Sequence, residues 1–204
     1  MYQDINHDSI QPLSFDPIIE EIFRELGYML HKIYRVAFPN EIKGIKSPSR
    51  ENDWEKTKTN LFEFLKSYEV SPDLITKTIA HHAFLQSKSG ECVYQETSHN
   101  IVRPLMATRR VIEDPDKILG KNFTFGCFLD FLVRCSKSAF NKKVDGESLA
   151  LLLEKMELSE GFAKQNLRTY TSNTTLLPSK RIVELLENSQ RAPTPATRKS
   201  MPKK

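Results

Sequence analysis

Residues 123–140, with the sequence FTFGCFLDFLVRCSKSAF, carry the strongest apolar pattern in the chain. Apolar side chains recur there at steps of three and four residues, the period of an α-helix. This spacing predicts a long helix over residues 125–140. Cys127 and Cys135 lie eight residues apart, on nearly one face, which favours a buried apolar role for both thiols. The other apolar positions are Phe128, Leu129, Phe131 and Leu132.

The segments on both sides of this helix show the same helical period. Asp16 followed by Pro17 is a favourable helix start, because aspartate caps the first turn and proline suits its first position. The apolar face that follows extends to about Ala37. We predict an all-α fold of about eight helices, with no strand longer than two or three residues. Further helices are expected at about residues 52–68, 72–87, 96–114 (bent or broken at Pro104), 145–156, 160 onward and 178–187.

Two stretches, residues 61–74 and 149–162, align without a gap at an offset of 88 residues. Apolar positions match apolar positions, and Ser71 matches Ser159. Each stretch predicts an amphipathic helix, an apolar residue that packs inward, and a serine that caps the next helix. The match is either a structural duplication or the ordinary similarity of two helix–turn–helix units.

A helix–loop–helix pattern extends from residue 105 to residue 139 and looks like an EF-hand. An EF-hand loop holds Ca²⁺ with oxygen ligands at positions 1, 3, 5, 7, 9 and 12. With Asp116 at position 1, Phe123 falls at position eight, where this family forms a short β bridge with a sister loop. Positions 3 and 5 hold an isoleucine and a glycine, and position 12 holds Cys127. Only the first ligand is present, so we expect no calcium here.

The same loop template fits residues 85–96 less well. Ser87 and Ser89 fall at positions 3 and 5 and Glu96 at position 12, but position 1 is a leucine. These three residues are weak candidates for an ion site. A third frame, residues 169–180, offers hydroxyls and an asparagine but no acid. The pattern predicts EF-hand-like units that keep their packing and bind no metal or other cofactor.

Residues 55–187 as a whole resemble the degenerate EF-hand-like modules found in structural proteins of cilia and flagella. The resemblance rests on FLKSYEVSPDL at residues 64–74 and on FTFGCFLDFLVRCSKSAF at residues 123–140. More distantly, the chain is similar to tubulin-polymerisation-promoting proteins. The resemblance implies a non-enzymatic scaffold on cytoskeletal partners, located in the cytoplasm at the cytoskeleton or in the axoneme of a cilium or flagellum.

Positive charge is concentrated at one end of the chain. The net charge is +4 at pH 7, but residues 188–204 hold five cations and no acid, so the preceding residues sum to −1. This segment lacks the apolar residues of a core, so we expect a disordered basic tail. It is either an end without a dedicated partner or a strap on an acidic polymer. The candidate partner-binding residues are Arg191, Arg198, Lys199, Lys203 and Lys204.

Acidic polymers include nucleic acid and the glutamate-rich surface of microtubules. The sequence of the folded part shows no basic helix with interleaved aromatic residues, which ranks nucleic acid below microtubules. No apolar run approaches the length of a membrane-spanning helix, and no membrane contact is expected.

Cysteine and histidine give no strong site in the sequence. Three cysteines without a CxxC spacing favour a reducing compartment over a disulfide framework. His81, His82, Cys92 and His99 form one cluster that could suit a metal, but adjacent histidines point to different faces of a helix. A cysteine nucleophile would need a base and an orienting group, and the sequence shows no such arrangement, so we expect no enzyme activity.

These observations predict an N-terminal arm (1–15), an EF-hand-like helical domain (16–187) with candidate repeats at 53–140 and 141–187, and the basic tail (188–204). The expected function is a non-enzymatic structural scaffold for protein partners, with tubulin or microtubules as the leading candidates. The alternative is a regulatory EF-hand-like adaptor that binds an amphipathic partner peptide, with or without a weak calcium site within residues 87–96.

Overall fold

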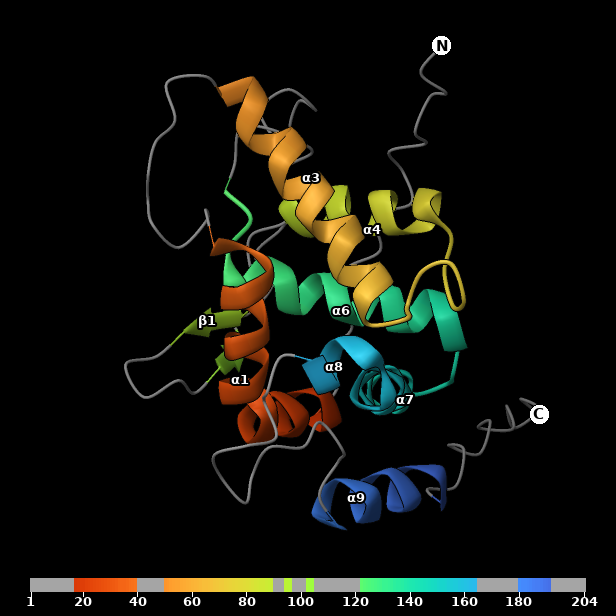
Figure 1. Cartoon of the computed structure of the whole chain (residues 1–204). Helices are drawn as coiled ribbons and strands as arrows, with labels where there is room; N and C mark the ends of the chain where they lie inside the picture. Colours follow the sequence, from red (N-terminus) through yellow and green to blue (C-terminus); the bar gives the residue numbers. More distant parts are fainter. Residues whose placement is uncertain are drawn as a thin grey trace, which may run out of the picture.

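The computed structural model describes residues 17–39, 50–89, 94–96, 102–104, 122–164 and 180–191. These residues form seven helices and two strands of three residues each (Figure 1), which confirms the predicted all-α class. The helices are α1 (Pro17–Ala37), α3 (Arg50–Ser67), α4 (Lys77–Ser89), α6 (Phe125–Phe140), α7 (Asp145–Leu158), α8 (Glu160–Lys164) and α9 (Lys180–Arg191); the strands are β1 (Tyr94–Glu96) and β2 (Val102–Pro104).

Helix α6 lies between α1, α4 and α7 at the centre of the fold (Figure 1). Its bounds are those predicted from the sequence. The Thr124 hydroxyl caps its start by accepting a hydrogen bond from the Cys127 N–H at 3.3 Å. Asn141, with a left-handed backbone at φ 44°, ends the helix and donates its N–H to the Lys137 carbonyl oxygen. Every residue from 125 to 136 is buried, as expected of a helix that packs on all sides.

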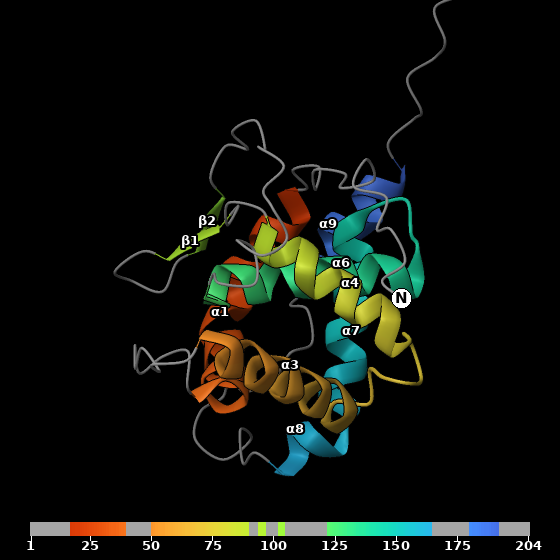
Figure 2. The same ribbon diagram turned by 90° about the horizontal axis from the view of Figure 1, so that it is seen from above.

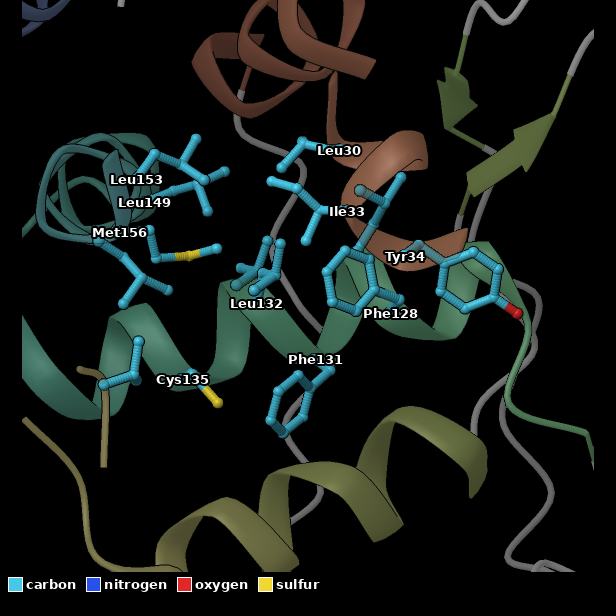
Figure 3. Close-up of a cluster of buried hydrophobic side chains, with 14 of the residues drawn as sticks. Leu30, Ile33, Tyr34, Phe128, Phe131, Leu132, Cys135, Leu149, Leu153 and Met156 are labelled. Atoms are coloured by element: carbon cyan, nitrogen blue, oxygen red, sulfur yellow. The ribbon is translucent and has the colours of Figure 1, made fainter. Parts of the chain in front are cut away.

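The side chains of α6 divide between its neighbours (Figure 3). Phe128 and Leu132 point toward α1, where they meet Leu30 and Ile33, while Phe131 and Cys135 point toward α4. Helix α7 supplies three buried side chains that point into the space between α1 and α6: Leu149, Leu153 and Met156. Burial of apolar side chains on every face of α6 is the main stabilising term of the fold.

A cluster of aromatic rings packs where the chain enters α6. The wholly buried Phe123 ring has its centroid 5.1 Å from that of Phe38 and 5.0 Å from that of Phe84. The Tyr34 hydroxyl donates a 2.7 Å hydrogen bond to the Phe123 carbonyl oxygen. Residues 122–124 belong to no strand, so the expected β bridge at Phe123 is wrong. The ring gains more free energy in the core than it would on an exposed loop.

The chain also differs from the prediction between residues 94 and 104. In place of a helix over residues 96–114, β1 and β2 pair in antiparallel order, with Glu96 opposite Val102 and Tyr94 opposite Pro104. Val102 is β-branched, and the residue before Pro104 is biased toward extended backbone. Pro104 ends the ladder, where its missing N–H costs least. Strand β2 lies against α1 and β1 against α6 (Figure 2); residues 105–114 lie outside the described residues.

The two aligned stretches agree only through their first helix. After Ser159, whose hydroxyl accepts from the Phe162 N–H at 3.3 Å, α8 follows at once as expected. After Ser71 the chain instead makes turns, and α4 begins only at residue 77. Val70 is buried, whereas the aligned Leu158 is 72% exposed. Leu158 therefore does not pack inward as predicted.

The two stretches contact each other where α8 lies beside the end of α3. A Cβ atom on Gly161 would overlap the Ser67 carbonyl oxygen, so only glycine allows this approach. Nearby, the Glu69 carboxylate accepts hydrogen bonds from Lys155 Nζ at 3.2 Å and from the Glu160 N–H at 3.3 Å. Both bonds lower the pKa of Glu69, and the bond from Lys155 has the larger effect.

Candidate partner-binding surface

The weak ion-site candidates do not form a loop. Ser87 lies within α4, is buried, and donates its hydroxyl to the Phe84 carbonyl oxygen at 2.8 Å. Ser89 is the last residue of α4 and Glu96 the last residue of β1. Residues 85–89 are therefore helical, which corrects the expectation that they begin an EF-hand loop. Among the described residues, no group of three or more His, Cys, Asp or Glu residues could hold a metal ion.

The other two loop frames are described only in part. Of the frame that begins at Asp116, residues 122–127 are described; Phe123 is in the core and Cys127 is helical. Of the frame at 169–180, only Lys180 is among the described residues, as the first residue of α9.

The thiols of Cys127 and Cys135 are both buried, as the sequence predicted. The Thr124 hydroxyl donates to Cys127 Sγ at 3.3 Å, which adds a weak polar contact to an apolar site. Burial raises the pKa of the Cys135 thiol, because the thiolate would lose its hydration in the core. Cys92 lies outside the described residues.

His81 packs at the contact between α3 and α4. Its ring centroid lies 6.0 Å from that of Trp54, and its Nε2 atom is buried without a hydrogen-bond partner among the described residues. Burial lowers the pKa of His81, and the positive charge of Lys58 lowers it further. His82, the next residue, is partly buried, and His99 lies outside the described residues. This is the environment of a packing residue.

A buried ion pair lies within α6, and one of its members also bonds to α4. Asp130 Oδ2 accepts a 2.9 Å hydrogen bond from Arg134 Nε, and both side chains are less than a tenth exposed. Arg134 Nη1 donates to Gln86 Oε1 on α4 at 3.0 Å. Sequence reasoning missed this pair, although an acid four residues before an arginine in an apolar helix is a recognisable signal. The Arg134–Gln86 hydrogen bond links α6 to α4.

Large apolar side chains remain exposed on several helices of the described structure. Their exposed fractions range from 37% to 72%. Single exposed apolar residues are normal, so a neighbouring charge pattern is needed to indicate a binding surface. The residues are Tyr28, Val36, Ile79, Leu158, Val183 and Leu185.

Such a pattern is found on the outer face of α1, and we call Tyr28, Lys32, Arg35 and Val36 the α1 ridge. Tyr28 and Val36 are each 56% exposed, and Arg35 is exposed between them. Lys32 Nζ lies 4.5 Å from the centroid of the Tyr28 ring, a cation–π geometry. Sequence reasoning placed α1 correctly but used only its buried face, and so missed this surface.

The predicted tail residues lie almost entirely beyond the described structure. Residues 188–191 were expected in the disordered tail but belong to α9, which ends at Arg191, so this part of the prediction is wrong. Arg198, Lys199, Lys203 and Lys204 lie outside the described residues. No helix of the described structure is long and apolar enough to cross a membrane.

No protein-family model, curated protein or solved structure matches the chain. The α1 ridge and the basic tail are therefore interpreted from their own chemistry.

Proposed function

We propose that the chain is a non-enzymatic scaffold protein that docks on an acidic cytoskeletal partner, with the microtubules of cilia or flagella as the leading candidate. The observation that carries the proposal is the segregation of charge, with five cations and no acid in residues 188–204 of an otherwise nearly neutral chain. Cations near an anionic surface each contribute about 1 kcal/mol, so the tail supplies a salt-sensitive attraction of a few kcal/mol at most. The choice of microtubules comes from the resemblance of residues 55–187 to axonemal EF-hand-like modules.

The folded part supports a role in binding. The thiols of Cys127 and Cys135 and the ring of His81 contribute to packing between helices. The surface presents exposed apolar and cationic side chains, including Leu158 and the α1 ridge. A helical core that exposes apolar and cationic side chains and carries a basic extension is expected of a scaffold protein that binds other proteins.

The experiment is cosedimentation of the full chain with microtubules at low salt. Because α9 ends at Arg191, truncation after this residue removes residues 192–204 and keeps the helix whole. A second variant replaces Arg198, Lys199, Lys203 and Lys204 by glutamine. Both variants should bind at least about threefold more weakly, because four cations no longer face the partner. Unchanged binding by both variants would show that the tail is not a strap.

The regulatory adaptor is the second candidate function, and α9 is the observation in its favour. Ile182 is wholly buried and Leu186 partly buried, and α9 contacts α1, while Val183 and Leu185 stay exposed. The other helices thus hold the amphipathic helix α9 on their surface. Adaptors that recognise helical peptides bind them in the same way. Calorimetry with Ca²⁺ tests the calcium-dependent form of this adaptor: heat that disappears in Glu96→Ala would favour it over the scaffold.

A further inference from the structure

The four side chains of the α1 ridge form one continuous strip. Residues 28, 32, 35 and 36 follow one another at steps of four, three and one, which places them on neighbouring lines along one face of the helix. The opposite face of α1, with Ile33 and Tyr34, is buried in the core. The fold therefore fixes the ridge on a rigid element and directs it outward.

The ridge carries positive charge that its own helix does not neutralise. The chain has no acidic residue between Leu26 and Asn40. The ion pairs of α1 lie nearer its start, where Arg24 contacts Glu20 at 3.6 Å and Glu21 at 2.5 Å. Within the described part of the chain, Lys32 and Arg35 take part in no salt bridge, and Lys32 instead lies over the Tyr28 ring.

We infer that the α1 ridge binds an extended, glutamate-rich segment of a protein partner, with an apolar side chain of that segment against Tyr28 and Val36. Side chains three apart on a helix are about 5–6 Å apart at their Cβ atoms. Glutamates two apart on an extended strand are about 7 Å apart on one face, a spacing that the long Lys32 and Arg35 side chains can match. The cation–π contact already orders Lys32, so less conformational entropy is lost on binding.

This inference rests on the proposed function, because it gives the acidic partner of the tail a second contact on the folded body. The α1 ridge has two cations between exposed apolar side chains, so it suits a partner segment that has carboxylates beside an apolar side chain. Nucleic acid would call for more cations, since each phosphate contact adds its own charge neutralisation. Oligonucleotide binding is therefore an outcome that the test must distinguish.

The test uses the full chain in which Arg198, Lys199, Lys203 and Lys204 are replaced by glutamine, so that the tail does not compete. The probe is a synthetic glutamate-rich peptide of about ten residues that carries one leucine, at about 50 mM salt. The ridge variant is Lys32→Glu with Arg35→Glu. The matched control is Lys56→Glu with Lys66→Glu, which makes the same charge change at two exposed positions of α3.

The ridge variant should bind the peptide about tenfold more weakly, and the α3 control should change the affinity by less than about twofold. Backbone amide resonances of residues 28–36 should shift on titration. If circular dichroism shows that charge reversal perturbs the fold, Lys32→Gln with Arg35→Gln repeats the comparison. Equal weakening by ridge and control variants, or tighter binding of a single-stranded oligonucleotide at the same residues, would overturn the inference.

The two proposals fail separately. Peptide binding at the ridge in a chain that does not pellet with microtubules would reject the cytoskeletal assignment and keep the ridge. Tail-dependent pelleting that the ridge variant leaves unchanged, together with unchanged peptide affinity, would keep the proposed function and reject the ridge.

Discussion

The hydroxyl of Tyr34 in α1 donates a 2.7 Å hydrogen bond to the carbonyl oxygen of Phe123, 89 residues later in the chain. Both residues are buried, so the bond ties the first helix to the residue that leads into α6. Tyr34→Phe removes the donor and keeps the ring. The free energy of unfolding should fall by about 0.5–1.5 kcal/mol, the usual net contribution of one intramolecular hydrogen bond. Urea denaturation measures the change.

The exposed Tyr28 provides the control for this substitution. Tyr28→Phe should alter the free energy of unfolding by less than about 0.5 kcal/mol. A Tyr34→Phe variant as stable as the parent chain would contradict the structural role given to the bond.

The sequence predicted α6 to the residue, and the reason is physical. Its apolar residues recur at helical spacing, Thr124 precedes it as a cap, and Asn141 tolerates the left-handed backbone that ends it. The β1–β2 hairpin was missed because three-residue strands carry too little pattern, and their place depends on contact with α1 and α6. Leu158 and Val70 looked equivalent in sequence, yet only the packing around each decides which is buried.

The close approach of Gly161 to Ser67 predicts intolerance to any side chain at position 161. Gly161→Ala should lower the free energy of unfolding by about 1–3 kcal/mol, because the Ser67 carbonyl is backbone and can move only with α3. The matched change on the exposed face of α8, Ala163→Ser, should cost less than about 0.5 kcal/mol. Thermal unfolding of the two variants gives the comparison, and equal melting temperatures would disprove the contact.

His81 predicts a dependence of stability on pH. Burial lowers its pKa below the ordinary 6.5, so the unfolded chain binds a proton at a higher pH than the folded chain does. The contribution of His81 to the free energy of unfolding is fully present above pH 6.5. It decreases as the pH falls from 6.5 through the folded-state pKa. The groups that act on it are Lys58 and Glu55 on α3 and His82 beside it on α4.

The measurement is chemical denaturation at several pH values between about 5 and 8. His81→Gln should show a shallower loss of stability below pH 6.5 than the parent chain, while His82→Gln keeps the loss caused by His81. A parent chain and a His81→Gln variant with the same pH profile would show that His81 is not linked to folding.

The burial of Cys135 predicts that its thiol reacts slowly in the folded chain. In a Cys92→Ser background, the remaining described thiols, Cys127 and Cys135, should react with a thiol reagent at least about a hundredfold more slowly in buffer than in urea, because modification requires opening of the core. Cys135→Ser should also cost about 1–3 kcal/mol, since a hydroxyl replaces sulfur in an apolar site. Rapid labelling of Cys135 in the native state would contradict its burial.

The candidate surface was predictable only in part. Composition revealed the basic tail, because a run of cations without acids can be read directly from the sequence. The α1 ridge required the structure: helical periodicity identifies the buried face, but it does not show whether another element covers Tyr28 or Val36. The buried Asp130–Arg134 pair was missed because charged residues in a helix are usually solvated, and their burial here depends on α4.

The salt dependence of microtubule binding by the full chain tests the proposed function most directly. Cosedimentation should show binding at about 50 mM salt. At about 200 mM salt the affinity should be lower by about tenfold, and by at least fivefold, because salt screens the charge of the tail cations. Failure to pellet at the lower salt concentration, or an affinity that stays constant across this range, would contradict docking on an acidic partner.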